Sequence, residues 1–154
     1  MESRSHSSAS LNVLLIGNNP MELGTVLEQL NQVRAQKINT EIAFDLKSVV
    51  ERLMMFNPNF ILIDDNIGRR DLREVVKRLS SNKKTKNIPI TVLKSSNYHE
   101  AFGAGSIMDY LLKQNLTADG LYNTVKHSLR FQRTHQYLQS IYQTRKTDVL
   151  RLSY

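Results

Sequence analysis

The chain has 154 residues, of which 40% are hydrophobic, and it contains no cysteine. This size suits one domain with a substantial apolar core, and the absence of cysteine excludes disulfides, thiolate metal sites and a cysteine nucleophile. The formal net charge of +7 favours acidic partners. Because the basic residues are mostly scattered along the chain, we do not expect nucleic-acid binding.

The first ten residues, MESRSHSSAS, are polar and rich in serine. Such a composition is typical of a disordered tail, which we expect over residues 1–10. The segment lacks the apolar stretch of a secretion signal, and no apolar run approaches the ~20 residues that a membrane helix needs. Together with the absence of cysteine, this predicts a soluble protein of the cytoplasm without membrane contact.

From Leu11 onward, short apolar runs alternate with segments of helical periodicity. The expected strands are Leu11–Ile16, Asn39–Phe44, Phe60–Ile63, Ile88–Leu93 and Ile107–Leu111. The expected helices are 21–32, 48–56, about 70–79, a short one near 98–104, and a last one with Thr117 as its N-cap. Strands that alternate with helices indicate a parallel sheet covered on both faces, so we predict a doubly wound, five-stranded α/β fold.

In such folds the functional residues follow the carboxyl ends of the strands. The residues at these positions are Gly17 and Asn18 after the first strand, Asp64 and Asp65 after the third, Lys94 and Ser95 after the fourth, and Lys113 after the fifth. Carboxylates beside a lysine suit a divalent cation and an aspartyl phosphate, because the metal and the lysine offset the charge of a transferring phosphoryl group.

Two segments of the chain resemble the receiver domain of bacterial two-component response regulators. Residues 58–64, PNFILID, are similar to its "Pro-Asp, apolar strand, Asp" segment, and residues 104–113, AGSIMDYLLK, to its "Gly-Ala, Asp-Tyr-Leu, Lys-Pro" segment. The resemblance implies a flavodoxin-like (βα)5 receiver domain over residues 11–130. It also implies that Asp64 is the phosphoacceptor, Lys113 the phosphate-contacting lysine and Tyr110 the switch aromatic, with a histidine kinase or phosphotransfer protein as partner.

The departures from this family concern the metal site. Gly17 and Asn18 stand where the family carries its acidic pair, and Mg²⁺ prefers charged oxygen ligands. Asp64 is therefore a weak candidate metal ligand, Asp65 is a weaker one, and we expect magnesium to bind weakly. Lys94 aligns with the family's Thr or Ser, with Ser95 one position later, and a Lys94–Asp64 pair would partly mimic the metal.

These departures leave two functions open. One is a receiver of a phosphorelay that accepts a phosphoryl group on Asp64. The other is a pseudo-receiver that works without phosphorylation, as a dimerisation or protein-interaction module. We do not expect an enzyme, because no second carboxylate or general base is placed for phosphohydrolase chemistry at Asp64.

Residues 131–154 continue the last helix without glycine or proline and form a predicted helical extension or linker. A weak heptad of 4-3 spacing runs through Phe131, His135, Leu138, Tyr142, Arg145, Val149 and Leu152. We expect this helix to pair two subunits or to lead to an output domain; the alternative is an amphipathic helix folded onto its own domain. The other surface on which we expect a homodimer is the helix-four, strand-five face.

Overall fold

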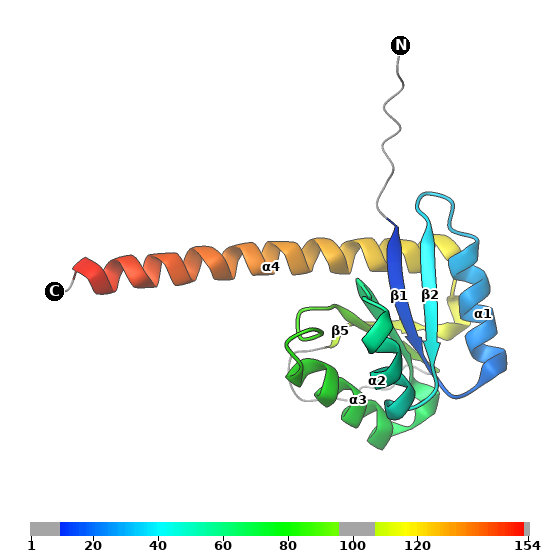
Figure 1. Cartoon of the computed structure of the whole chain (residues 1–154). Coiled ribbons are helices and arrows are strands. Elements are labelled where there is room, and N and C mark those ends of the chain that lie inside the picture. Colours follow the sequence, from blue (N-terminus) through cyan, green and yellow to red (C-terminus); the bar gives the residue numbers. More distant parts are fainter. Residues whose placement is uncertain (1–9, 96–106, 153–154) are drawn as a thin grey trace, which may run out of the picture.

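The computed structural model describes residues 10–95 and 107–152, in which five parallel strands form one sheet (Figure 1). The strands are β1 (Leu11–Ile16), β2 (Ile38–Ala43), β3 (Phe60–Asp64), β4 (Ile90–Lys94) and β5 (Ile107–Leu112). Their order in the sheet is β2-β1-β3-β4-β5. The chain thus proceeds from β1 to one edge and then returns past it to the other, which confirms the doubly wound prediction.

Helices cover both faces of the sheet (Figure 1). They are α1 (Pro20–Asn31), α2 (Leu46–Met55), α3 (Arg69–Ser81) and α4 (Ala118–Leu152), with two single 3-10 turns, η1 (Asp65–Ile67) and η2 (Lys113–Asn115). Buried residues of α1 and α4 form one core layer, and those of α2 and α3 form the other. The short helix expected near residues 98–104 and most of the expected tail over residues 1–10 lie outside the described residues.

Strand β3 is the most deeply buried strand, because layers of side chains cover both of its faces. Phe60 and Leu62 belong to the core layer of α1 and α4, whereas Ile61 and Ile63 belong to that of α2 and α3. This explains why its sequence is a continuous apolar run without the alternation of a half-exposed strand. The strand therefore delivers Asp64, its last residue, to the edge of the sheet from a fixed position.

Side-chain caps fix where the helices around this edge begin. Asn19 Oδ1 accepts hydrogen bonds from the N–H groups of Met21 and Glu22, at 3.0 and 3.4 Å, and Pro20 occupies the first helical position of α1. Thr117 Oγ1 accepts from the N–H of Gly120 at 3.0 Å, which confirms the predicted N-cap of the last helix. Element boundaries differ from the expected ones by one or two residues in most places.

Helix α4 has 35 residues and extends well beyond the sheet (Figure 1). Among the residues of α4 whose burial is described, Leu121, Val125 and Ser128 are buried and lie near its start, whereas Phe131 and Tyr142 are 57% and 66% exposed. The helix continues without interruption across the predicted domain boundary between residues 130 and 131. None of the helices in the described part of the chain is long and apolar enough to cross a membrane.

The position of the buried residues in α4 predicts that residues 131–154 are dispensable for folding. A chain that ends after Arg130 should fold, with a thermal midpoint within a few degrees of that of the full chain. Circular dichroism during heating measures both the helical signal and this midpoint. A truncated chain that does not fold would instead make these residues part of the domain.

Candidate functional site

Asp64 lies at the carboxyl end of β3 with a side chain that is only 2% exposed. Its Oδ1 atom accepts a hydrogen bond from the N–H of Asn66 at 2.9 Å, so the carboxylate caps η1. Its Oδ2 atom is buried and has no hydrogen-bond partner among the described residues. Since a buried acceptor without a partner is costly, Oδ2 is a position at which a donor or a cation would be favoured.

The ammonium group of Lys113 lies among three carboxylates. Lys113 is the first residue of η2, directly after β5, and its Nζ atom is 2.9 Å from Asp64 Oδ1. The same Nζ is 3.1 Å from Glu22 Oε2 and 3.5 Å from Asp65 Oδ1. The three carboxylates come from β3, the first turn of α1 and η1, so this one cation joins elements that are far apart in the sequence.

The environment of Lys113 keeps its side chain charged. Burial lowers the pKa of Lys113, but hydrogen bonds to Asp64 and Glu22 and the attraction of Asp64 and Asp65 outweigh it, so the net pKa is raised. A raised pKa in the folded state means that the stabilising contribution is complete below the ordinary lysine pKa. It is lost as the pH rises through the pKa of the folded state, so the site keeps its cation at neutral pH.

Lys94, the last residue of β4, and Ser95, which follows it, lie in different surroundings. Ser95 donates to Asp65 twice, from its N–H to Oδ2 at 3.0 Å and from its hydroxyl to Oδ1 at 2.8 Å. The Nζ of Lys94 lies 4.6 Å from the centre of the Tyr110 ring, a cation–π contact. Burial raises the pKa of Tyr110, whose ring packs against the core layer of α2 and α3.

Gly17 lies against Asp64, at the first of the two degenerate acidic-pair positions. A Cβ atom added to Gly17 would approach Leu23 Cδ2 to 2.6 Å and Asp64 Cβ to 3.2 Å. The space beside Asp64 therefore suits glycine, and a longer side chain would displace the buried Leu23. Packing therefore also explains why the first of the two acidic-pair positions carries no carboxylate.

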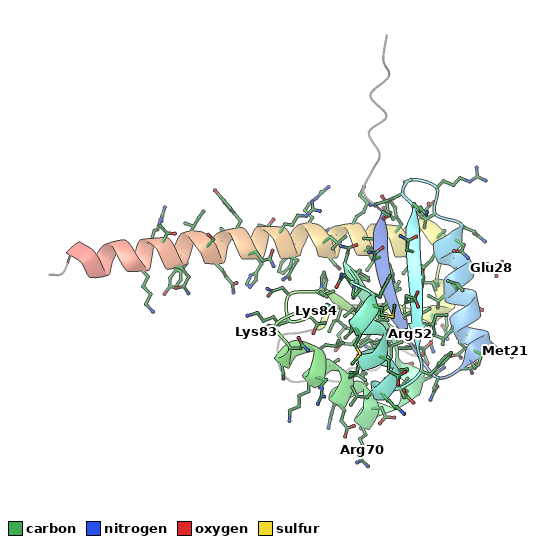
Figure 2. The ribbon with its side chains drawn as sticks, viewed as in Figure 1. Met21, Glu28, Arg52, Arg70, Lys83 and Lys84 are labelled. Carbon is green, nitrogen blue, oxygen red and sulfur yellow. The ribbon has the colours of Figure 1, made fainter. Side chains whose placement is uncertain are left out.

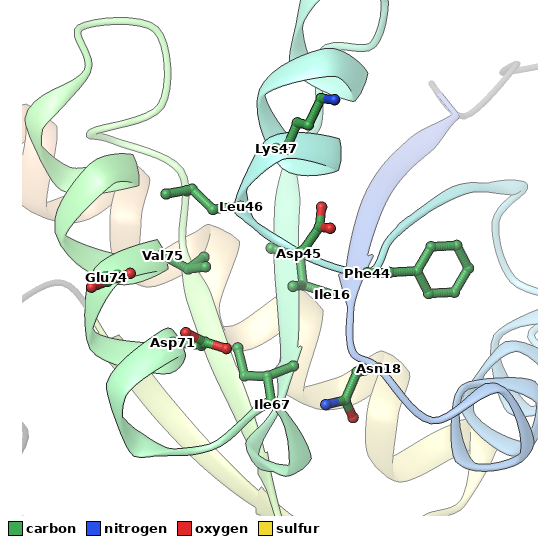
Figure 3. A pocket seen from close by; sticks show the side chains of 10 residues that line it. All are labelled: Ile16, Asn18, Phe44, Asp45, Leu46, Lys47, Ile67, Asp71, Glu74 and Val75. Atoms are coloured by element: carbon green, nitrogen blue, oxygen red, sulfur yellow. The ribbon is translucent and has the colours of Figure 1, made fainter.

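Asn18, at the second of these positions, is exposed and lines a hollow of about 280 Å³ between the start of α2 and the start of α3 (Figure 3). The hollow has an apolar floor that includes Ile16, and Asp45, Asp71 and Glu74 lie around it. Asp45 caps α2 by accepting from the N–H of Ser48 at 2.8 Å, an interaction that lowers the pKa of Asp45. The three carboxylates that contact Lys113 do not line this hollow.

Several of the described basic side chains come from different elements of the fold. In Figure 2, Arg70 projects from the start of α3, whereas the Lys84 ammonium donates to the carbonyl oxygen of Leu53 in α2. Arg70 is within 3.5 Å of Glu74, and Arg52 is within 3.8 Å of Glu41. That nucleic acid is not a partner stays a prediction from the sequence.

The comparisons with known proteins identify the fold. No family model and no curated protein match the sequence, but many solved structures do. The receiver domain of a Pseudomonas aeruginosa sensor histidine kinase, which has a magnesium ion in its active-site cleft, is 17% identical with a TM-score of 0.63, covering 79% of this chain and 98% of its own. The N-terminal domain of a response regulator receiver protein from Methanoculleus marisnigri is 27% identical with a TM-score of 0.56, covering 75% and 94%.

A third match extends further along the chain. A fusion that carries a trimeric coiled-coil segment of yeast Spc42 is 19% identical with a TM-score of 0.64, and it covers 94% of this chain and 97% of its own. Because it leaves so little of this chain unmatched, this match includes most of α4. The chain has the fold of response-regulator receiver domains, as its motifs predict.

The described residues do not fit a magnesium site of the kind that this fold can hold. Among them, no group of three or more His, Asp or Glu side chains is arranged to hold a metal ion. The carboxylates of Glu22, Asp64 and Asp65 are arranged around an ammonium group instead. Asp64 Oδ2 is a free oxygen ligand, but Mg²⁺ requires several oxygen ligands in octahedral order.

Of the residues at this site, Glu22 is the one that the sequence did not predict. It belongs to a helix, whereas the strand-end rule selects only residues that directly follow strands. The signal that was available is the Asn-Pro pair at 19–20, which starts α1 so early that Glu22 falls in its first turn. A carboxylate in that turn lies at the same edge of the sheet as Asp64.

The packing of Gly17 gives a testable contrast with a second glycine. Gly17→Ala should destabilise the fold by about 1–3 kcal/mol, because its Cβ would displace the buried Leu23. Gly24→Ala should stabilise it by about 0.5–1 kcal/mol, since Gly24 lies within α1 and nothing lies within 4 Å of its added Cβ. Urea unfolding measures both changes, and equal effects of the two substitutions would contradict the packing argument.

Proposed function

We propose that this chain is a receiver module of two-component signalling that works through protein contacts, without magnesium-dependent phosphorylation. The similarity to receiver domains supports the general signalling role. The observation that carries the finer proposal is the position of Lys113. Its ammonium group lies at the centre of the cluster formed by the carboxylates of Glu22, Asp64 and Asp65. The module has no enzymatic activity of its own in this proposal, and we expect it to work in the cytoplasm.

Electrostatics favours a pocket whose carboxylates are already paired with Lys113 and hold no metal ion. Phosphoryl transfer to a carboxylate brings further negative charge beside Asp64 and Asp65, and a divalent cation normally offsets that charge. Here Gly17 and Asn18 supply no carboxylate for such a cation, and Lys113 supplies only one positive charge. The pocket therefore favours one permanent state, in which Lys113 is paired with the carboxylates. In this proposal, surfaces of the module carry the signal.

The second candidate function is phosphorylation of Asp64 by a histidine kinase or phosphotransfer protein. The unpartnered Oδ2 atom of Asp64 favours it, because that oxygen is available to attack phosphorus. The new O–P bond would form as the P–N bond of a donor phosphohistidine breaks, and the leaving imidazole would take up a proton, which leaves neutral histidine and an acyl phosphate. Lys113 would then contact the phosphoryl oxygens, and Mg²⁺ is the cofactor that this candidate requires.

Addition of Mg²⁺ and beryllofluoride, a mimic of the phosphoryl group, distinguishes the two functions. We expect the amide resonances of Asp64, Lys94 and Tyr110 to stay in place, because the pocket lacks the acidic pair. Two-dimensional NMR of the labelled chain measures this. Saturable shifts that disappear in Asp64→Asn would overturn the first function and support phosphorylation.

We propose further that α4 joins two copies of the chain. Phe131, Leu138 and Tyr142 lie on one stripe of the protruding helix and are more than half exposed. The rings of Phe131 and His135 stack along this stripe, with centroids 6.2 Å apart. A helix pair would cover these apolar side chains.

The dimer proposal predicts different effects for two neighbouring substitutions. Leu138→Glu places a charge in the stripe and should give a monomer, whereas Gln139→Glu lies on another side of the helix and should leave the dimer intact. Sedimentation velocity over a range of concentrations measures the oligomeric state. A full-length chain that stays monomeric at high concentration would contradict the proposal.

A further inference from the structure

We propose that Lys113 is the built-in cation of this pocket, and that Glu22 positions it there in place of the missing acidic pair. The inference rests on the proposed function, because it explains how a receiver pocket does without a metal ion. It assigns a role to Glu22, a residue of α1 that has no counterpart among the predicted site residues. Its evidence is the geometry around a single nitrogen atom.

The start of α1 brings Glu22 to the pocket. Only three residues separate the end of β1 from Pro20, which begins the helix after the N-cap Asn19, so Glu22 lies in the first turn. From there its Oε2 atom reaches Lys113 Nζ at 3.1 Å, although the two residues are 91 positions apart in the sequence. A carboxylate in the first turn is also favoured by the helix dipole.

The ammonium group of a lysine has three N–H donors, and three carboxylates surround that of Lys113. Two of them accept at hydrogen-bond distance, Asp64 at 2.9 Å and Glu22 at 3.1 Å, and Asp65 lies at 3.5 Å. The Lys113 side chain is only 15% exposed, so the group is held within the pocket. A divalent cation at the position of Nζ would have to displace the ammonium group, so Lys113 competes with a metal ion for these three carboxylates.

Glu22 differs from its partners in being replaceable. Its side chain is 42% exposed, whereas those of Asp64 and Asp65 are almost fully buried. Neutralising Glu22 therefore leaves no buried polar group without a partner at this position, because solvent reaches its side chain. The expected effect is on the position of Lys113, which would lose one of its two close acceptors.

The first test removes the cation. Lys113→Met leaves Glu22, Asp64 and Asp65 around an apolar side chain, and we expect it to bind Mn²⁺ about tenfold more tightly than the unchanged chain, or better. Titration followed by the electron paramagnetic resonance of free Mn²⁺ measures this. Lys126→Met, at an exposed lysine of α4 that lies over the Tyr122 ring, is the matched control and should bind as the unchanged chain does.

The second test keeps the lysine and removes its positioning residue. In Glu22→Gln, Lys113 should react severalfold faster with an amine-reactive ester at a fixed pH, as measured by peptide mass spectrometry. Glu28→Gln, an exposed glutamate of the same helix (Figure 2), should leave the rate unchanged. Glu22→Gln keeps all buried charges paired, so this test can be made even if Lys113→Met does not fold.

The outcomes separate the inference from the proposed function. Unchanged labelling of Lys113 in Glu22→Gln would overturn the role of Glu22, and a folded Lys113→Met that binds no more Mn²⁺ would overturn the role of the lysine as the built-in cation. Either result leaves the response to beryllofluoride as it is. Conversely, an Asp64-dependent response of the unchanged chain to Mg²⁺ and beryllofluoride would overturn the proposed function, whatever the labelling rates.

Discussion

The contact between Asp64 and Lys113 is the interaction on which the rest of the site depends. A carboxylate with 2% exposure is stable in its charged form only if a cation or several donors accompany it. Removal of one partner from a buried ion pair typically costs about 3–5 kcal/mol, because the other charge is left uncompensated. The strand that ends in Asp64 and the strand that ends before Lys113 are therefore tied together by charge as well as by the sheet.

Much of the fold could be predicted because it depends on local patterns. The continuous apolar run at 60–63 predicts a strand covered on both faces, and the alternation with helical segments predicts a parallel sheet, as observed. Asp64, Asp65, Ser95 and Lys113 could be selected because parallel strands end at one edge. These residues meet around two contacts, Asp64–Lys113 and Asp65–Ser95.

The remainder depends on contacts over long sequence separations, which no local pattern contains. Glu22 reaches Lys113 only because a cap sets the first turn of α1 and because β5 ends opposite that turn. The metal-mimic role that the sequence suggested for Lys94 stays a prediction, and the contact described for Lys94 is with the Tyr110 ring, which lies further along the chain. The need for glycine at position 17 is likewise set by Leu23, which packs from the neighbouring helix.

Helix α4 acts geometrically as a lever. Its first turns pack against the core and against α1, and the rest continues outward as the same rigid rod. At 1.5 Å per residue, the part beyond residue 130 is about 33 Å long, so a tilt of about 10° at its base would move its tip by about 6 Å. A small rearrangement beside the pocket, where α1 begins, would thereby become a displacement as large as a helical turn at a distant point.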